Sequence, residues 1–351
     1  MSRSFQSHAA AETRPDADGV TVLAVFVTDS SGKPFIEEYF GRSSSIKSDK
    51  IGEDSVFWIY SVTKTITAIA VLQCVERGQI RLDDSVYDIL LELKNFQIIG
   101  HDQKGNITLH PHKERIKLHF RPGGCLVEST RKPFQETQRR HTLPISSSSQ
   151  VMAGSMEGGV EWAGILVERL NKMKLGEYMK TNIFEPLEMA STTFHPDQDP
   201  TIKERLVETS TGISDGTLAP MEGPYPAVTE DDSGAMGLVS SVPDLAKLTT
   251  DLLQPKPKVL GEESLKELFS PQFSADSSSA GMLAYGAVSL TYKEPFDTRI
   301  LTSFEMMYGR LIGKEYDPRK VGQAPGAYYI KEDTRTLPGA MLVMTGIPNL
   351  V

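Results

Sequence analysis

The stretch FWIYSVTKTITAIAVLQCVERGQIRLDDSV, residues 57 to 86, joins a Ser-x-x-Lys pattern to an apolar helix. Ser61 and Lys64 stand three positions apart at the start of that helix, and Gly78 follows its last apolar turn. Apolar residues lie nearly all round the predicted helix, which covers residues 62–77. A helix of this kind is typical of the centre of a domain, so we expect it to be buried.

Ser61 and Lys64 have the spacing of a nucleophile and its base. Residues three apart share a helix face, so a lysine ammonium group can reach the serine hydroxyl. In a buried site, desolvation lowers the pKa of a lysine and lets it accept a proton. The helix N-terminus adds N–H groups that stabilise an oxyanion. The residues alone leave an alternative, in which Ser61 only caps the helix and Lys64 lies on the surface.

The Ser-x-x-Lys pattern is weak by itself because it occurs four times in the chain. The other copies begin at Ser30, Ser44 and Ser129. The first falls in a predicted hairpin turn, and the other two fall in polar stretches without periodicity. Only Ser61 precedes a strongly apolar helix, so context favours this copy as the functional one.

Composition indicates a globular protein, with 351 residues of which 39% are hydrophobic and 24% are charged. A net charge of -9 does not favour a nucleic acid as partner. The N-terminus has no apolar leader, and no run of about 18 apolar residues occurs, so we expect a cytoplasmic protein without membrane contact. Cys74 and Cys125 are too few for a disulfide framework, and we expect Cys74 to be a buried, inert thiol.

The remaining periodicity predicts a hairpin and several helices. Two β-rich runs, residues 20–28 and 35–40, are joined by a turn that contains Gly32. Helices are predicted over residues 162–170 and 175–183, and after Ser241 as N-cap with Pro243 in the first turn. Residues 96–155 show no sustained period.

Four histidines in the aperiodic stretch invite a metal hypothesis. They are His101, His110, His112 and His119. Their spacing matches no standard zinc pattern, and Pro111 holds two of them in an extended segment. We therefore expect no metal and no cofactor.

The stretch YSVTKTITAIAVLQCVERGQIRLDDSVYDIL resembles the nucleophile helix of the serine β-lactamase and penicillin-binding-protein superfamily, in its class C-like esterase and transesterase branch. Two later stretches, GVEWAGILVERLNKMKLGEYMKTNIFEPLEM and SGAMGLVSSVPDLAKLTTDLL, resemble helices of that family in the same order. MTGIPNL resembles the terminal strand motif of fungal polyketide acyltransferases.

The resemblance implies an α/β (α+β) fold, in which an antiparallel sheet is flanked by helices and joined to an all-helical part. It implies a disordered leader over residues 1–18 and a single β-lactamase-related domain over 19–351. The sheet part would cover about 19–80 and 205–351, and the helical part about 80–200.

The resemblance also implies the chemistry. Ser61 would be acylated by an ester, thioester or lactam, and Lys64 would take its proton. The backbone N–H of Ser61 and one from residues 345–347 would form the oxyanion hole. Met344, Thr345 and Gly346 would line the substrate.

Three functions remain open at this stage. The first is an acyltransferase or transesterase of secondary metabolism, which moves an acyl group from a carrier-protein or CoA thioester to a small-molecule alcohol. The second is a carboxylesterase or β-lactamase-like hydrolase, in which water accepts the acyl group. The third is a catalytically impaired relative with a binding role or none.

The third alternative arises from departures from the family pattern: the catalytic tyrosine is missing, and the sequence ends at Val351, where the family continues with one more strand and a C-terminal helix. No tyrosine occurs between Tyr87 and Tyr178, and about Met156 stands where the family has its catalytic tyrosine. Tyr178 lies inside a predicted helix, where packing is its expected role. The family's His-Thr-Ser-Gly-Leu turn is also absent. Divergence of the gene, or translation through an intron or a shifted reading frame around residues 108–155, would account for these losses.

Overall fold

A computed structural model describes residues 3–14, 22–28, 30–44, 49–95, 97–101, 107–111, 117–121, 124–128, 156–212, 218–220, 230–269 and 340–343. In chain order the described elements are α1 (Arg3–Glu12), β1 (Val22–Thr28), β2 (Pro34–Gly41), β3 (Val56–Trp58), the 3₁₀ turn η1 (Tyr60–Val62), α2 (Thr63–Glu76), η2 (Leu91–Asn95), β4 (Gln97–His101), β5 (Ile107–Pro111), β6 (Lys117–Arg121), β7 (Gly124–Glu128), α4 (Met156–Asn171), α5 (Leu175–Met179), the π-helical η4 (Lys180–Phe184), η5 (Pro196–Gln198), α6 (Pro200–Arg205), β8 (Ser210–Gly212), β9 (Leu218–Pro220), β10 (Val239–Ser241), α7 (Val242–Leu252), α8 (Glu262–Phe269) and β11 (Ala340–Val343).

The β11–β1–β2 sheet confirms the expected antiparallel sheet, which combines the N-terminal hairpin with a C-terminal strand. Successive residues of a strand face opposite sides of its sheet. On one side of β1, Ala24 belongs to a buried cluster with Val242 and Ala246 of α7. On the other side, Val25 belongs to a cluster with Ala9 of α1. Because both faces are covered, every residue of β1 is buried.

The expected disordered leader is wrong over residues 3–12, which form α1 against β2. Ala9 is buried, and the Gln6 side-chain amide donates a hydrogen bond of 2.7 Å to Glu38. The leader contains few apolar residues, so its pattern gave no helical signal.

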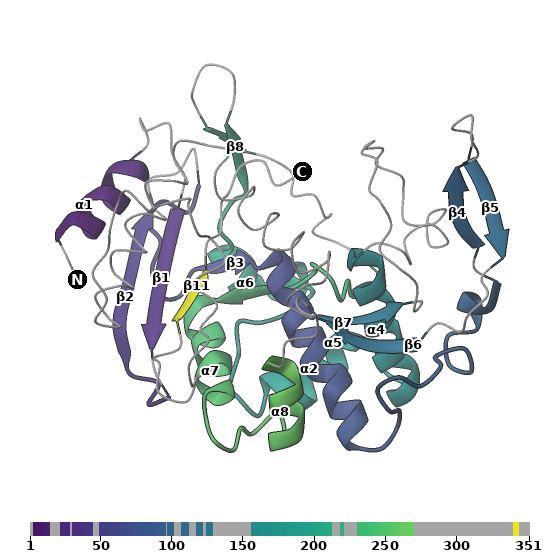
Figure 1. The fold of residues 1–351 in the computed structure, drawn as a ribbon. Helices are drawn as coiled ribbons and strands as arrows, with labels where there is room; N and C mark the ends of the chain where they lie inside the picture. Colours follow the sequence, from purple (N-terminus) through teal and green to yellow (C-terminus); the bar gives the residue numbers. More distant parts are fainter. Residues whose placement is uncertain are drawn as a thin grey trace, which may run out of the picture.

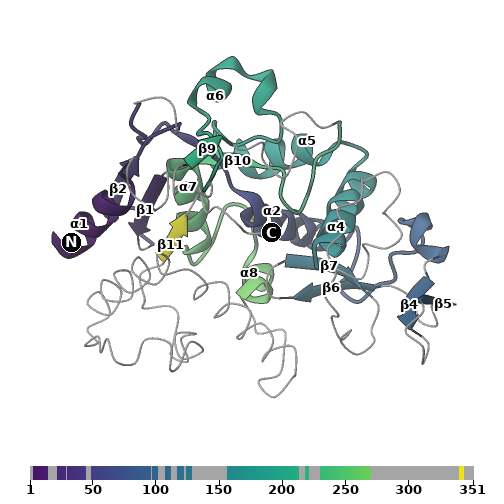
Figure 2. The ribbon, with the colours of Figure 1, turned by 90° about the horizontal axis from the view of Figure 1, so that it is seen from above.

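Helix α2 is the predicted buried helix, and it lies in the middle of the molecule in two perpendicular views (Figures 1 and 2). Eleven of its fourteen residues are buried. Its apolar residues form one cluster with residues of α4, α5 and α7. The sheet lies on one side of α2, and α4 lies on the other (Figure 2). Burial on all sides explains why its sequence is apolar all round.

The other predicted helices are also present. The helix predicted over 162–170 is α4, and the one over 175–183 is α5 with its continuation η4. Ser241 caps α7, because its Oγ accepts a hydrogen bond of 3.3 Å from the backbone N–H of Asp244. Pro243 stands in the first turn, as expected.

The stretch without periodicity holds two hairpins, β4–β5 and β6–β7. His101, His110 and His119 stand on these strands, and His112 lies outside the described residues. Within the described ranges no group of three or more His, Cys, Asp or Glu side chains is arranged to hold a metal ion. None of the described helices is both long and apolar enough to cross a membrane. Because these hairpins fall within residues 80–200, that part is not all-helical as expected, and the bounds of the sheet part and the helical part stay a prediction.

Candidate active site

The site begins where β3 turns sharply into α2. β3 pairs with β10 through Trp58 and Val239, and the next residue, Ile59, donates its N–H to the carbonyl of Leu238 at 3.0 Å. The backbone of Tyr60 then takes a φ of +40°, which is uncommon for a residue with a side chain. This bend begins η1, which contains Ser61 and leads directly into α2. Backbone strain of this kind often accompanies functional sites.

Ser61 and Lys64 are in direct contact. Lys64 Nζ donates a hydrogen bond of 2.9 Å to Ser61 Oγ. The serine is exposed, whereas Lys64 is only 2% exposed. The N-cap of α2 is Val62, and no side chain caps the helix. The alternative that Ser61 is a cap and Lys64 a surface residue is therefore wrong.

Residues 231–235, which we call the anchoring segment, fix Lys64 from the far side. Lys64 Nζ donates a second hydrogen bond, of 3.2 Å, to the carbonyl of Ala235. One turn along α2, Thr67 Oγ1 donates to the carbonyl of Gly234 at 2.7 Å. The ammonium group is thus held between the nucleophile and a backbone carbonyl, in a position from which it can exchange a proton with Ser61.

Glu161 of α4 binds the same segment from its other side. Its carboxylate accepts hydrogen bonds from Ser233 Oγ at 2.5 Å and from the backbone N–H groups of Gly234 and Ala235 at 3.0 and 3.3 Å. Burial raises the pKa of Glu161, and these hydrogen bonds and the charge of Lys64 act against that rise. Glu161 is not among the site residues predicted from the sequence. It is one of three glutamates in α4, and no sequence pattern sets it apart from the other two.

Two glycines allow α4 to approach the anchoring segment. A Cβ atom at Gly164 would lie 2.9 Å from Leu175 Cδ2 and 3.5 Å from the Cα atom of Gly234. A Cβ atom at Gly234 would lie 3.2 Å from the carbonyl oxygen of Val160. A side chain at either position would therefore push the two elements apart. The close contact brings Glu161, one turn before Gly164, within reach of the segment.

A sequence model describes the family of serine enzymes named beta-lactamase, and it matches residues 9–111 and 125–303, most of the chain. The chain belongs to the beta-lactamase family.

Related proteins and structures agree with this assignment. The chain is 28% identical over 255 residues to the acyltransferase calJ of Penicillium decumbens, which covers 66% of this chain and 60% of that protein. It is 28% identical over 215 residues to a lovastatin esterase of Penicillium rubens, covering 55% of this chain and 53% of the esterase. A simvastatin synthase structure from Aspergillus terreus matches with a TM-score of 0.65 and 21% identity, over 83% of this chain and 76% of the synthase. The structural match shows a common fold.

The alignments leave part of each relative unmatched, since the chain spans 60% and 53% of the lengths of the two curated relatives described above. What the relatives do is therefore a source of hypotheses for this member of the family. The geometry of Ser61 and Lys64 is a property of this chain itself.

Tyr178 does not take the place of the family's tyrosine. It is 1% exposed, its hydroxyl is 3.9 Å from the thiol of Cys74, and Arg77 lies over its ring at 5.3 Å. Cys74 follows Lys64 by ten residues along α2, a distance of about 15 Å at the rise of an α-helix. Burial raises the pKa values of both Tyr178 and Cys74. Tyr178 has a packing role, and Cys74 is the buried thiol that was expected.

Tyr178→Phe is expected to leave the rate of Ser61 acylation within about twofold of that of the unchanged protein, because the hydroxyl lies at the far end of α2 from Lys64. The burst of p-nitrophenol from an acyl ester measures this rate. A loss of tenfold or more without a change in melting temperature would instead make Tyr178 the missing phenol.

Three expected substrate-binding residues, Met344, Thr345 and Gly346, lie outside the described residues, as do 345–347 of the expected oxyanion hole. β11 ends directly before them, at Val343, which pairs with Ala24 of β1. Met156 is the first residue of α4, and its side chain is not among those described.

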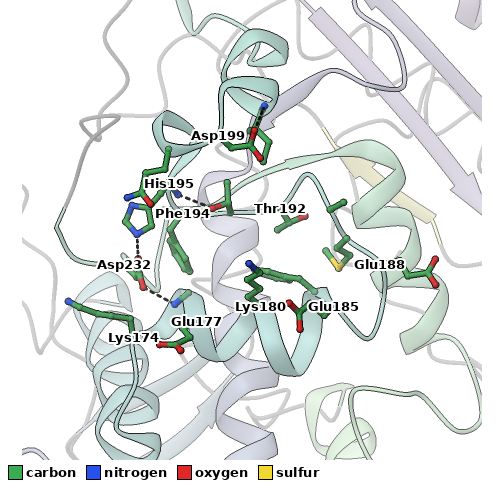
Figure 3. A pocket seen from close by; sticks show the side chains of 17 residues that line it. Lys174, Glu177, Lys180, Glu185, Glu188, Thr192, Phe194, His195, Asp199 and Asp232 are labelled. Carbon is green, nitrogen blue, oxygen red and sulfur yellow. Dashed lines mark hydrogen bonds and ion pairs between the residues drawn. The ribbon is translucent and has the colours of Figure 1, made fainter.

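A cavity of about 840 Å³ lies beside the anchoring segment between α5, η4 and residues 189–202 (Figure 3). His195 Nε2 lies 2.8 Å from Asp232 Oδ1 on its wall, and the other oxygen of Asp232 accepts the N–H of Gly176 at 2.7 Å. Neither Ser61 nor Lys64 lines this cavity. Asp232 belongs to the anchoring segment, so the pair with His195 helps to fix that segment from a third direction.

Proposed function

We propose that the chain is an acyltransferase of secondary metabolism, which transfers an acyl group through an acyl-Ser61 intermediate to a small-molecule alcohol. The contact of 2.9 Å between buried Lys64 Nζ and exposed Ser61 Oγ carries the proposal. It places a base against a nucleophile that a substrate can approach. The names of the relatives, an acyltransferase and a lovastatin esterase, support acyl chemistry on small molecules.

The reaction follows from these two side chains. Ser61 Oγ attacks the acyl carbonyl while neutral Lys64 takes the hydroxyl proton, and the proton then passes to the leaving group as its bond to the acyl carbon breaks. The acceptor alcohol attacks the acyl-serine, and Lys64 takes the alcohol proton and returns it to Ser61 Oγ. The backbone N–H of Ser61 and one from residues 345–347 would stabilise the oxyanion. Met344, Thr345 and Gly346 would contact the substrate.

The donor and the location belong to the same proposal. A thioester of a carrier protein or of CoA is the expected donor, because a thiolate leaves more readily than an alkoxide. An enzyme that uses such a donor would act in the cytoplasm. No cofactor takes part in these steps.

A second candidate is a carboxylesterase or β-lactamase-like hydrolase, favoured by the relative named as a lovastatin esterase. Its chemistry differs only in that water attacks the acyl-serine. A third candidate is an impaired enzyme. It is favoured by the position of Tyr178 of α5, whose hydroxyl lies beside Cys74, ten residues along α2 from Lys64, and cannot supply the phenol of the family relay.

Covalent labelling separates these candidates. The purified protein is incubated with a fluorophosphonate or a p-nitrophenyl acyl ester, and tryptic peptides are analysed by mass spectrometry. The proposal predicts one adduct on Ser61. Added small alcohols should then discharge the acyl-enzyme faster than water does.

Each result decides one point. An intact protein that stays unlabelled, in an assay where a related serine enzyme reacts, would overturn both enzymatic candidates. Labelling with discharge to water alone would select the hydrolase. Sequencing the transcript across codons 100–160 gives an independent check, because a tyrosine codon recovered there would supply the missing phenol.

A further inference from the structure

We propose that Glu161 is a positioning residue for the Ser61–Lys64 pair. Its carboxylate holds the anchoring segment in place, so that the carbonyl of Ala235 keeps the Lys64 ammonium group opposite Ser61 Oγ. This inference rests on the proposed function and deepens it. Glu161 acts through Lys64 and contacts neither substrate nor nucleophile.

Two consecutive residues carry the connection from α4 to α2. Gly234 donates its N–H to Glu161 and accepts a hydrogen bond from Thr67. Ala235 donates its N–H to Glu161 and accepts one from Lys64. Both residues are therefore held on one side by the carboxylate and on the other side by the nucleophile helix. Hydrogen bonds linked in series in this way strengthen one another.

The third hydrogen bond of Glu161 comes from Ser233, which directly precedes Gly234 and Ala235. Ser233 Oγ donates to the carboxylate at 2.5 Å and also accepts the N–H of Met236 at 3.2 Å. A carboxylate with two oxygens can accept all three donors at once, and an uncharged amide of the same shape cannot. Loss of the carboxylate would leave a donor without its acceptor and loosen the segment.

Charge supplies a second link between Glu161 and Lys64. The positive charge of Lys64 favours the ionised carboxylate, and by reciprocity the carboxylate favours the protonated lysine. Neighbouring ionisable groups have partners of their own. Asp231 is paired with Lys174 at 2.8 Å, and Asp232 with His195 at 2.8 Å. Without the charge of Glu161, Lys64 should therefore lose its proton at a lower pH than in the unchanged protein.

The test compares three variants in the full chain. Glu161→Gln removes the charge and one acceptor, and Glu161→Asp keeps the charge but shortens the reach. Glu168→Gln is the matched control, because Glu168 stands seven residues later on α4, is half-buried, and accepts a hydrogen bond of 2.9 Å from the N–H of Leu175. Two quantities are measured: the pH profile of the Ser61 labelling rate, and hydrogen exchange in peptides covering residues 231–238.

Glu161→Gln should lower the maximal labelling rate by about tenfold to 100-fold, as expected for displacement of a catalytic group by about 1 Å. The midpoint of its pH profile should move to lower pH. Glu161→Asp should lower the Ser61 labelling rate but leave the midpoint of its pH profile unchanged. Both variants should exchange faster over residues 231–238, and Glu168→Gln should match the unchanged protein in both measurements.

Failure of this inference differs from failure of the proposed function. If the unchanged protein is labelled and both Glu161 variants label at its rate and midpoint, Glu161 has no positioning role. If the unchanged protein is never labelled, the proposed function fails, and hydrogen exchange alone still decides whether Glu161 holds the segment. Unchanged exchange in Glu161→Asp would overturn the inference even if Glu161→Gln does not fold.

Discussion

Ser61→Ala is expected to abolish the covalent adduct and to reduce acyl transfer to the background rate. A methyl group cannot attack a carbonyl, so only the part of catalysis that comes from substrate binding would remain. Ser61 is exposed, so Ser61→Ala should keep its fold, since surface substitutions usually change stability by less than about 0.5 kcal/mol. Mass spectrometry after fluorophosphonate treatment and the rate of p-nitrophenyl ester cleavage measure the two losses.

The chain offers a matched control in its first Ser-x-x-Lys copy. Ser30 is exposed in the turn between β1 and β2, and its hydrogen bond to Gln254 is made by its backbone carbonyl. Ser30→Ala should therefore leave labelling and rate unchanged. An adduct that persists in Ser61→Ala would show that another nucleophile reacts and would contradict the assigned role of Ser61.

Lys64→Met is expected to lower the rate of acylation by about 10² to 10⁴, the usual contribution of general acid–base catalysis. Methionine fills a similar volume, but it can neither take the Ser61 proton nor donate to Ala235. The fold should persist, because an apolar side chain at a position that is 2% exposed avoids the cost of burying a charge. Stopped-flow measurement of the p-nitrophenol burst gives the rate, and thermal unfolding gives the stability.

Two comparisons sharpen the prediction for Lys64. Lys33→Met makes the same substitution at the exposed lysine of the first Ser-x-x-Lys copy, and it should have no effect on the rate. The double variant Ser61→Ala with Lys64→Met should be no slower than Ser61→Ala alone, since groups that act as a unit do not contribute additively. Additive losses would mean that the two side chains act in separate steps.

Sequence patterns predicted the elements whose contacts are strong and periodic. Helix α2 is apolar on all sides because it is packed on all sides, and the hairpin of β1 and β2 is joined by a short turn at Gly32. The cap of α7 was also predictable, since an N-cap is a contact between Ser241 and a residue only three positions away. Contacts between residues that are close along the chain can therefore be predicted from sequence patterns.

The features that the sequence did not predict depend on contacts between segments that are far apart along the chain. Helix α1 was missed because a contact at Ala9 with a sheet formed elsewhere places it, and few apolar residues mark it. Glu161 was missed because α4 contains three glutamates, and none of them can be assigned a role until its partners are known. Those partners, residues 233–235, are more than 70 positions away along the chain.

The sequence by itself determined that Ser61 and Lys64 would be neighbours, because three positions across a helix start bring the two side chains to one face. It could not decide that this serine is exposed while this lysine is buried. The tertiary structure decided that, by bringing Ala235 against Lys64 from 171 positions away and by holding it there through Glu161. Spacing sets local proximity, whereas burial and a fixed hydrogen-bond partner come from packing between distant segments.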